Sequence, residues 1–189
     1  MTKIAITGGI GSGKSYVCNL LERRGIKVYD SDAAAKRLMR QDAEIRDRLS
    51  SLVGSEVYVG CELQKSVLAK YLLQSEENKL AIDDIVHPAV ARDFLQSGYT
   101  WLESAILFDS GFDRRIAFDY IVGVAAPVET RIARVMARDG ISREKALGWI
   151  ERQLPQEEVV SRCHFVIEND GERDLNKQIN QLIIQINNI

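Results

Sequence analysis

The chain has 189 residues, of which 46% are hydrophobic and 28% charged, and its formal net charge is -2 at pH 7. At about 150 residues per domain, this length predicts one globular domain with room for a small insertion, and the composition excludes a disordered or fibrous chain. No apolar run approaches the roughly 18 residues of a membrane span, and the charge balance argues against a dedicated nucleic-acid partner.

The N-terminus and the cysteines predict the compartment. Residues 1–7 form a short apolar segment that lacks the longer apolar region and the cleavage site of a signal peptide. Cys18, Cys61 and Cys163 are odd in number and far apart, which indicates neither a zinc site nor a dithiol redox site. We therefore expect a reduced, cytoplasmic protein with no membrane partner. A monomer is the simplest state, although the sequence leaves an oligomer open.

Strand signals alternate with helix-period segments along most of the chain. After a β-branched strand at residues 3–7, apolar residues recur at helical spacing, and four more strand patterns follow at residues 26–29, within 99–108, at 119–125 and at 164–168. This alternation predicts an α/β fold of three layers, in which helices cover both faces of a five-stranded parallel sheet.

Two segments interrupt the alternation. Residues 31–95 carry helical spacing without a good strand signal, and Pro88 predicts a helix boundary or a kink there. Residues 127–155 contain six basic and four acidic residues, which makes this segment locally positive in a chain of net charge -2. Within it, Ser142 is placed as a helix N-cap, with Glu144 in the first turn.

The most specific signal is a glycine-rich loop. Residues 8–15 read GGIGSGKS and fit the phosphate-loop pattern G-x-x-x-x-G-K-[ST], with a predicted strand before it and an amphipathic helix after it. The glycines let backbone N–H groups converge on phosphate oxygens, and the helix N-terminus favours the same anion. Lys14 can neutralise the β- and γ-phosphates, and the Ser15 hydroxyl can bind magnesium. A plain glycine turn is the alternative, but the flanking elements favour a nucleoside triphosphate site.

Several classes of protein share this loop. A GTPase should also carry DxxG and NKxD segments, and an ABC-type transporter should carry an LSGGQ-like signature; none of these is present. A small-molecule or nucleotide kinase needs a compact sheet, a helical acceptor-binding insertion and an arginine-bearing lid, and the chain has segments that fit all three. A non-catalytic nucleotide-dependent binding protein is the hypothesis from another class.

Two further groups of residues fit a kinase. Asp30 and Asp32 follow the second strand, where open α/β sheets bind ligands, and a kinase needs a carboxylate beside the acceptor hydroxyl. Either carboxylate could instead cap the following helix. Three arginines share one helix face and, with Arg152, could cover the phosphates or lie on a solvated surface: Arg131, Arg134 and Arg138.

Taken together, these residues resemble the dephospho-CoA kinase family. The segments on which the resemblance rests are TGGIGSGKS, then YDSDA at residues 29–33, IVHP at 85–88, ILFD at 106–109 and RIARVMARDG at 131–140. The residues Arg152-Gln153 and the turn at 167–171 also fit. The resemblance covers nearly the whole chain in order, and its combination of motifs is far more specific than the phosphate loop alone.

The resemblance implies a P-loop kinase that moves the γ-phosphate of ATP, with Mg²⁺, to the ribose 3′-hydroxyl of dephospho-CoA. It implies a nucleotide-binding core of residues 1–30, 96–126 and 156–189, a helical CoA-binding domain of residues 31–95 and a lid of residues 127–155. Another small-molecule or nucleotide kinase is the alternative.

The resemblance also implies the site residues. Asp32 becomes the catalytic base, Lys14 neutralises the transferred phosphate, Ser15 binds the metal, and Asp32 and His87 hold the acceptor. The ATP-binding positions are Gly9, Ile10, Gly11, Ser12, Gly13, Lys14, Ser15, Tyr16, Arg138, Asn169 and Gly171, the last two beside the adenine.

Three positions depart from the family pattern. Tyr16 stands where the family often has threonine, and Asp109 stands where it has glutamate. Glu103 stands where an aspartate is common, so it either supports the magnesium site or is only a polar residue at a strand end. His87 could equally shape the Pro88 turn without touching substrate.

Overall fold

The structure is a computed structural model in which residues 1–188 are described, and it divides into two compact units. The first unit contains Met1–Tyr29, Tyr99–Asp109 and the chain from Ala117 onward, and the second contains Asp30–Gly98 and Ser110–Ile116. Among the described residues, no helix combines the length and apolarity that crossing a membrane requires.

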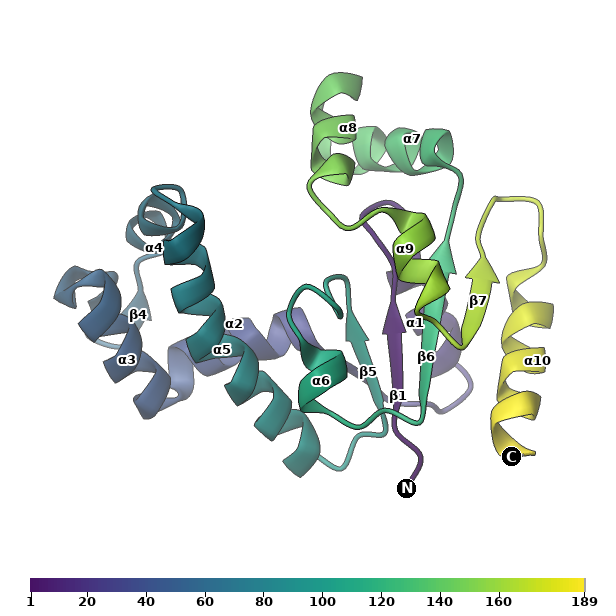
Figure 1. Ribbon diagram of the computed structural model, residues 1–189, viewed down its shortest axis with the longest axis horizontal. Helices are drawn as coiled ribbons and strands as arrows, with labels where there is room; N and C mark the ends of the chain where they lie inside the picture. Colours follow the sequence, from purple (N-terminus) through teal and green to yellow (C-terminus); the bar gives the residue numbers. More distant parts are fainter. Residues whose placement is uncertain (189) are drawn as a thin grey trace. The chain divides into compact units, whose positions relative to one another are not determined.

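A five-stranded parallel sheet organises the first unit. Its strands, in the spatial order β2-β5-β1-β6-β7, are β2 (Val28–Asp30), β5 (Trp101–Ser104), β1 (Ile4–Thr7), β6 (Tyr120–Ala125) and β7 (Phe165–Glu168). The chain extends the sheet first to the β2 edge and then to the β7 edge, so β1 lies in the centre (Figure 1). The predicted α/β fold with five parallel strands is confirmed, and ligands bind such sheets outside the carboxyl ends of the strands.

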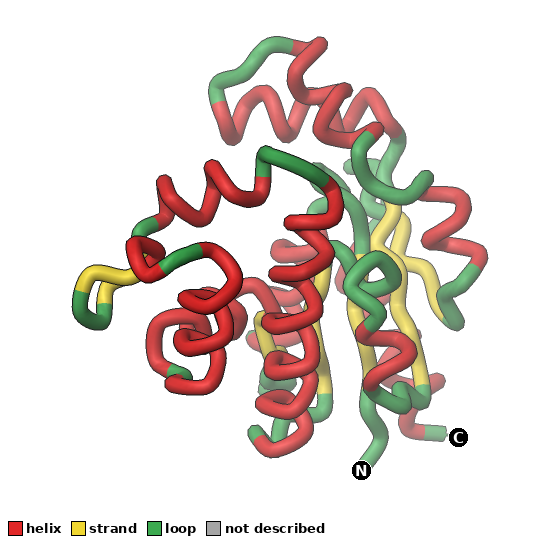
Figure 2. Tube along the Cα trace, turned by 60° about the vertical axis from the view of Figure 1, so that its left-hand side comes forward, coloured by secondary structure: helices red, strands yellow, loops and turns green. Residues whose placement is uncertain are grey.

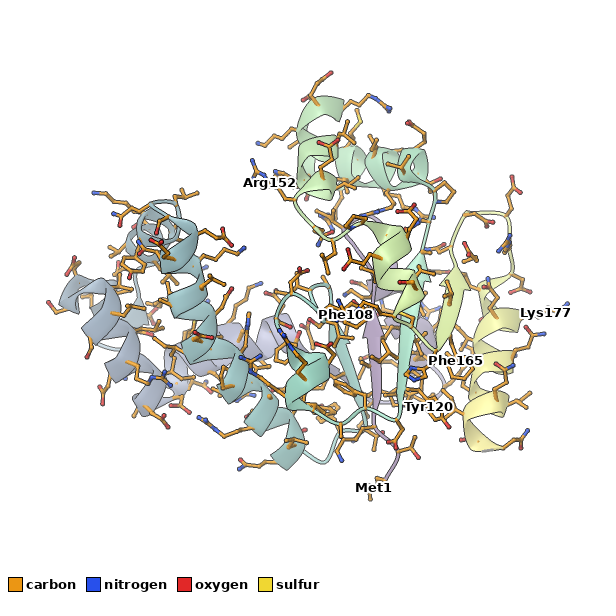
Figure 3. The ribbon with its side chains drawn as sticks, viewed as in Figure 1. Met1, Phe108, Tyr120, Arg152, Phe165 and Lys177 are labelled. Atoms are coloured by element: carbon orange, nitrogen blue, oxygen red, sulfur yellow. The ribbon has the colours of Figure 1, made fainter. Side chains whose placement is uncertain are left out.

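Burial explains why these segments form the sheet. All four residues of β1 are buried, as expected for a central parallel strand covered on both faces. Helices α1 (Lys14–Glu22) and α10 (Leu175–Asn187) contribute to one apolar cluster with β1, β6 and β7, and Leu21 and Ile179 are fully buried in it. On the neighbouring strands β6 and β7, the rings of Tyr120 and Phe165 pack with centroids 5.6 Å apart (Figure 3).

Helices α7 (Val128–Asp139) and α8 (Arg143–Glu151) form a pair beyond the carboxyl ends of the strands (Figure 1). They share a small apolar cluster of their own, which includes Ile132, Val135, Ala146 and Ile150. The predicted N-cap is confirmed, because Ser142 Oγ accepts a hydrogen bond from the Lys145 N–H at 3.3 Å. Helix α9 (Gln156–Ser161) then leads the chain to β7.

The second unit is mainly helical, as the spacing in residues 31–95 predicts. It contains α2 (Ser31–Gln41), α3 (Ala43–Val53), a 3₁₀ turn (Ser55–Val57), α4 (Lys65–Leu72), α5 (Glu76–Gln96) and α6 (Phe112–Arg115). It also contains a small hairpin, β3 (Tyr58–Val59) with β4 (Glu62–Leu63), which Figure 2 shows in yellow beside the helices. The sequence gives no strand signal there, because two residues are too few to show alternation.

Pro88 lies inside α5 and does not end it, so of the two predicted outcomes the helix boundary is wrong, and the kink stays a prediction. A proline within a helix removes one backbone hydrogen bond and crowds the preceding turn. Here the residues on either side of it, from Ile85 and Val86 to Ala89 and Val90, are buried. Their packing outweighs the local cost of the proline.

Candidate functional site

Two residues of the loop between β1 and α1 have a backbone conformation that favours glycine. Gly11 and Gly13 have φ angles of +79° and +85°, in the left-handed region that disfavours side chains. A Cβ at Gly11 would lie 2.6 Å from the Arg131 carbonyl oxygen, and a Cβ at Gly13 would collide with Nδ2 of Asn169. The loop is therefore shaped both by its own backbone and by two neighbouring segments.

The loop encloses a cavity suited to an anion. The cavity has a volume of about 400 Å³ and is lined by Gly8, Gly9, Ile10, Gly11, Gly13, Lys14, Ser15, Ala105, Arg134, Val135, Arg138 and Gln153. The first backbone N–H groups of α1 have no acceptor within the helix, and the helix dipole adds partial positive charge at this end. A phosphate group is the ligand that such an N-terminus binds best.

Lys14 is held at this cavity by Glu103. The two side chains form an ion pair, with 9% of Lys14 and 17% of Glu103 exposed. Glu103 lies near the carboxyl end of β5, which pairs with β1, so the sheet itself brings the carboxylate to the loop. The structure thus places Glu103 beside Lys14, and a role for this carboxylate at a magnesium site stays a prediction.

Side chains from α7 and from the turn after β7 bind the outward carbonyl groups of the loop. Arg131 Nε donates to the Ile10 oxygen at 2.9 Å, and Arg134 Nη1 donates to the Ser12 oxygen at 3.3 Å. Asn169 Nδ2 donates to that same Ser12 oxygen at 2.8 Å, in a buried hydrogen bond. These contacts support the loop on the side of its carbonyl groups, and they show that Arg131 and Arg134 are not simply solvated, whereas 61% of the Arg138 side chain is exposed.

The charge of Arg131 is nearly enclosed, because only 5% of the residue is exposed. Burial lowers the pKa of its guanidinium from the ordinary value, while Glu157 nearby acts in the opposite direction. A guanidinium stays protonated in proteins. A fixed positive charge therefore lies directly behind a loop that is built for phosphate.

The structure brings most of the predicted ATP-binding residues together. Those lining the cavity are Gly9, Ile10, Gly11, Gly13, Lys14, Ser15 and Arg138. Ser12 is fully buried, and its Oγ is a buried polar atom without a hydrogen-bond partner among the described residues. Tyr16 is 55% exposed on α1 and does not line the cavity. Asn169 is buried against the loop, and Gly171 lies in an exposed turn with a φ of +97°.

The two predicted acceptor residues lie in the second unit. Asp30 Oδ1 accepts the Ala33 N–H at 2.9 Å and so caps α2, which is one of the two roles that the sequence leaves open for this carboxylate. Asp32 lies in the first turn of α2, and 76% of its side chain is exposed although it pairs with Lys36. The structure thus leaves the second carboxylate open to solvent.

His87 lies on α5, and its side chain is mostly buried. Only 13% of its side chain is exposed, its Nε2 lies 3.5 Å from Asp83 Oδ1, and its ring packs against Phe112 at 5.5 Å. Burial lowers the pKa of His87 and raises the pKa of Asp83. Each side chain partly offsets the shift of the other.

The donors present at the cavity suit a hard divalent cation that is also held by phosphate. Among the described residues, no group of three or more His, Cys, Asp or Glu side chains could hold a metal ion by itself. The Ser15 hydroxyl lines the cavity, and the Glu103 carboxylate reaches its lysine. Magnesium typically uses one or two protein oxygens together with substrate phosphates and water, so this donor set fits it.

Gln153 is a member of the site that sequence reasoning missed. Its Oε1 accepts the Ile10 N–H at 2.7 Å, across a separation of 143 residues in the chain. In the sequence, Gln153 and its neighbour Arg152 stand out only as part of the family pattern. No local periodicity or spacing could have shown that a glutamine near the end of α8 reaches the phosphate loop.

Comparison with known proteins gives one consistent family. A family model described as dephospho-CoA kinase matches residues 2–174. A dephospho-CoA kinase from Bacteroides fragilis is 44% identical over 188 residues, covering 96% of this chain and 91% of the relative. One from Thermus thermophilus is 37% identical over 190 residues, covering 97% and 91%.

Solved structures agree with the observed fold. A crystal structure from Thermus thermophilus is 35% identical and superposes with a TM-score of 0.83, covering 97% of this chain and 96% of the other. A dephospho-CoA kinase from Campylobacter jejuni, 20% identical, has a TM-score of 0.69 over 97% and 96% of the two chains. A shikimate kinase from Acinetobacter baumannii, 17% identical, has a TM-score of 0.55 over 98% and 92%. The last two show the shared fold alone.

Proposed function

Because the chain belongs to the dephospho-CoA kinase family, we propose that it transfers the γ-phosphate of ATP to the ribose 3′-hydroxyl of dephospho-CoA, giving coenzyme A and ADP. The observation that carries the proposal is the phosphate loop with Lys14 at its cavity, in a chain that matches the family over residues 2–174. This reaction is the last step of coenzyme A biosynthesis. The comparisons do not favour the alternative of a kinase for another small molecule.

On the nucleotide side, the proposal assigns the triphosphate to the cavity. The N–H groups at the start of α1 bind phosphate oxygens, and Lys14 offsets the charge that develops on the transferred group. Arg138 lines the same cavity from α7, where its guanidinium pairs with Asp139, and it is our proposed arginine contact to the phosphates. Asn169 and Gly171 remain our proposed neighbours of the adenine, and Tyr16 a peripheral contact at the start of α1.

Mg²⁺ is the proposed cofactor, with Ser15 as its protein ligand and Glu103 as a carboxylate close by. When bound, the ion would neutralise part of the charge of the phosphates. Glu103 pairs with Lys14 at the cavity, which puts the carboxylate within reach of the phosphate region.

On the acceptor side, Asp32 is the proposed catalytic base. Phosphoryl transfer needs a carboxylate that orients the acceptor hydroxyl and takes its proton. The exposed side chain of Asp32 supports this role, because the neighbouring Asp30 is already used as the helix cap. The proposal also keeps His87 as an acceptor contact. Its ring is mostly enclosed, so at most its edge touches substrate.

The proposed division of labour follows the sequence boundaries. Residues 1–30, 96–126 and 156–189 form the nucleotide-binding core, residues 31–95 the acceptor-binding domain and residues 127–155 the lid. We further propose a monomer in the cytoplasm. The three free cysteines are what a reducing compartment predicts.

A panel of acceptors tests the proposal. The purified protein is incubated with Mg-ATP and, separately, dephospho-CoA, AMP, shikimate or water, and ADP release is measured. We expect rapid ADP release with dephospho-CoA alone. Faster turnover of another acceptor would replace the proposal by the alternative kinase, and ATP binding without turnover of any acceptor would indicate a nucleotide-dependent binding protein.

A further inference from the structure

Ile10 is the point at which residues 127–155 hold the phosphate loop. Its N–H donates to Gln153 Oε1 at 2.7 Å, and its carbonyl oxygen accepts from Arg131 Nε at 2.9 Å. Its side chain packs against the apolar cluster between α7 and α8. All three groups of one residue are therefore held from the same part of the chain.

The two hydrogen bonds fix two different peptide groups. The N–H belongs to the peptide between Gly9 and Ile10, and the carbonyl belongs to the peptide between Ile10 and Gly11. Glycines flank both, so the backbone here has an unusually wide choice of conformations. Gln153 and Arg131 narrow that choice by binding one peptide each, in addition to the bond within the loop from the Ser12 N–H to the Gly9 oxygen at 3.0 Å.

Gln153 reaches the loop from outside it. The residue follows the end of α8, on the segment before α9 where Figure 3 labels the neighbouring Arg152. Its side chain is half-buried and lines the cavity. A Cβ added to Gly9 would lie 3.0 Å from its Oε1, so the amide lies directly against the loop.

We propose that Gln153 is a positioning residue that, through the Ile10 N–H, presets the phosphate loop for the triphosphate. The inference rests on the proposed function only in taking ATP as the ligand. Without Gln153, the Ile10 N–H has lost its acceptor and the Gly9–Ile10 peptide is held only through the Gly9 oxygen, which accepts from the Ser12 N–H at 3.0 Å, so nucleotide binding must order it further. The cost therefore falls on ATP affinity, beyond any loss of stability.

Gln153→Met tests this proposal, because methionine keeps the length of the side chain and removes the acceptor. The matched control is Gln156→Met, since Gln156 Oε1 accepts the Ala126 N–H at 3.1 Å and so makes the same kind of bond away from the loop. One hydrogen bond is worth about 1 kcal/mol, so the ATP Kd by calorimetry should rise about fivefold in Gln153→Met. In the control it should stay within about twofold of the parent.

A second substitution isolates the bond itself. Ile10→Pro removes the N–H that Gln153 accepts. If the glutamine acts through that N–H, Gln153→Met should change the ATP Kd by less than about twofold in the Ile10→Pro background. An undiminished fivefold effect there would overturn the proposal, as would a parent-like Kd in the single variant accompanied by a lower melting temperature.

Amide hydrogen exchange keeps the proposal testable even where a variant folds poorly. In the nucleotide-free parent protein, the Ile10 amide should be protected from exchange, and Gln153→Met should abolish that protection. An unprotected Ile10 amide in the parent would overturn the proposal. A protein that binds ATP but does not phosphorylate dephospho-CoA would refute the proposed function and leave the role of Gln153 to be judged from these binding measurements.

Discussion

Gly13 offers a sharp test of how the phosphate loop is built. It is the N-cap of α1, with a φ of +85°, and the space for its Cβ is taken by the Asn169 amide. Gly13→Ala therefore does two things at once. It puts a side chain into the left-handed region, and it displaces the amide that holds the Ser12 carbonyl at 2.8 Å.

Gly25 supplies a matched control for the first effect alone. Its φ is +82°, and an added Cβ would meet nothing within 4 Å. An alanine in the left-handed region costs about 1–2 kcal/mol, which is the loss expected for Gly25→Ala. Losing the buried Asn169 contact adds about 1–3 kcal/mol, so Gly13→Ala should lose about 2–5 kcal/mol in total.

The free energy of unfolding of both variants is measured by urea titration, with the ATP Kd alongside. The excess loss in Gly13→Ala should shrink when Asn169→Ala is present in both the reference and the variant, because the clash is then gone. Equal losses in the two glycine variants would refute the reasoning. So would an excess that survives removal of the Asn169 side chain.

Three more predictions concern single side chains. Asp32→Asn should lower kcat by about 10²–10⁴-fold with little change in ATP Kd. The control Asp30→Asn removes the same charge but keeps a capping side chain, so its kcat should stay within about threefold of the parent value. Similar losses of kcat in both variants would exclude Asp32 as the base. Burial lowers the pKa of His87, so as the pH falls the unfolded chain takes up a proton on this residue before the folded chain does, and folding stability falls below about pH 6.5. The free energy of unfolding, measured with urea at about pH 7 and about pH 5.5, should therefore decline less in His87→Gln than in the parent. An equal decline in the two proteins would contradict the shift. Burial raises the pKa of the Cys163 thiol to about 11, so peptide mass spectrometry after brief iodoacetamide treatment at neutral pH should find the exposed Cys61 modified first, and faster labelling of Cys163 would argue against its burial.

Local sequence patterns were sufficient for the sheet and the loop. The β-branched run of β1 and the glycines and lysine that follow it carry their information within a few residues, so both the strand and the phosphate loop could be predicted. Ser142 was predictable for the same reason, since a helix cap depends on its immediate neighbours.

Contacts between distant segments could not be predicted in this way. The hydrogen bonds from Gln153 to Ile10 and from Asn169 to Ser12 join residues 143 and 157 positions apart. The pair between Lys14 and Glu103 exists because β1 and β5 are neighbours in the sheet. The helix boundary predicted at Pro88 is wrong for the opposite reason. The local rule for proline predicts an end there, but tertiary packing keeps α5 continuous.

The central claim is that this chain phosphorylates the ribose 3′-hydroxyl of dephospho-CoA. The most direct measurement is mass spectrometry with phosphorus NMR on the products of a reaction with Mg-ATP and dephospho-CoA. We expect a product that carries one additional phosphate as a 3′-monoester, identical to coenzyme A, with one ADP formed for each molecule. ADP without that product, or a phosphate at any other position, would contradict it.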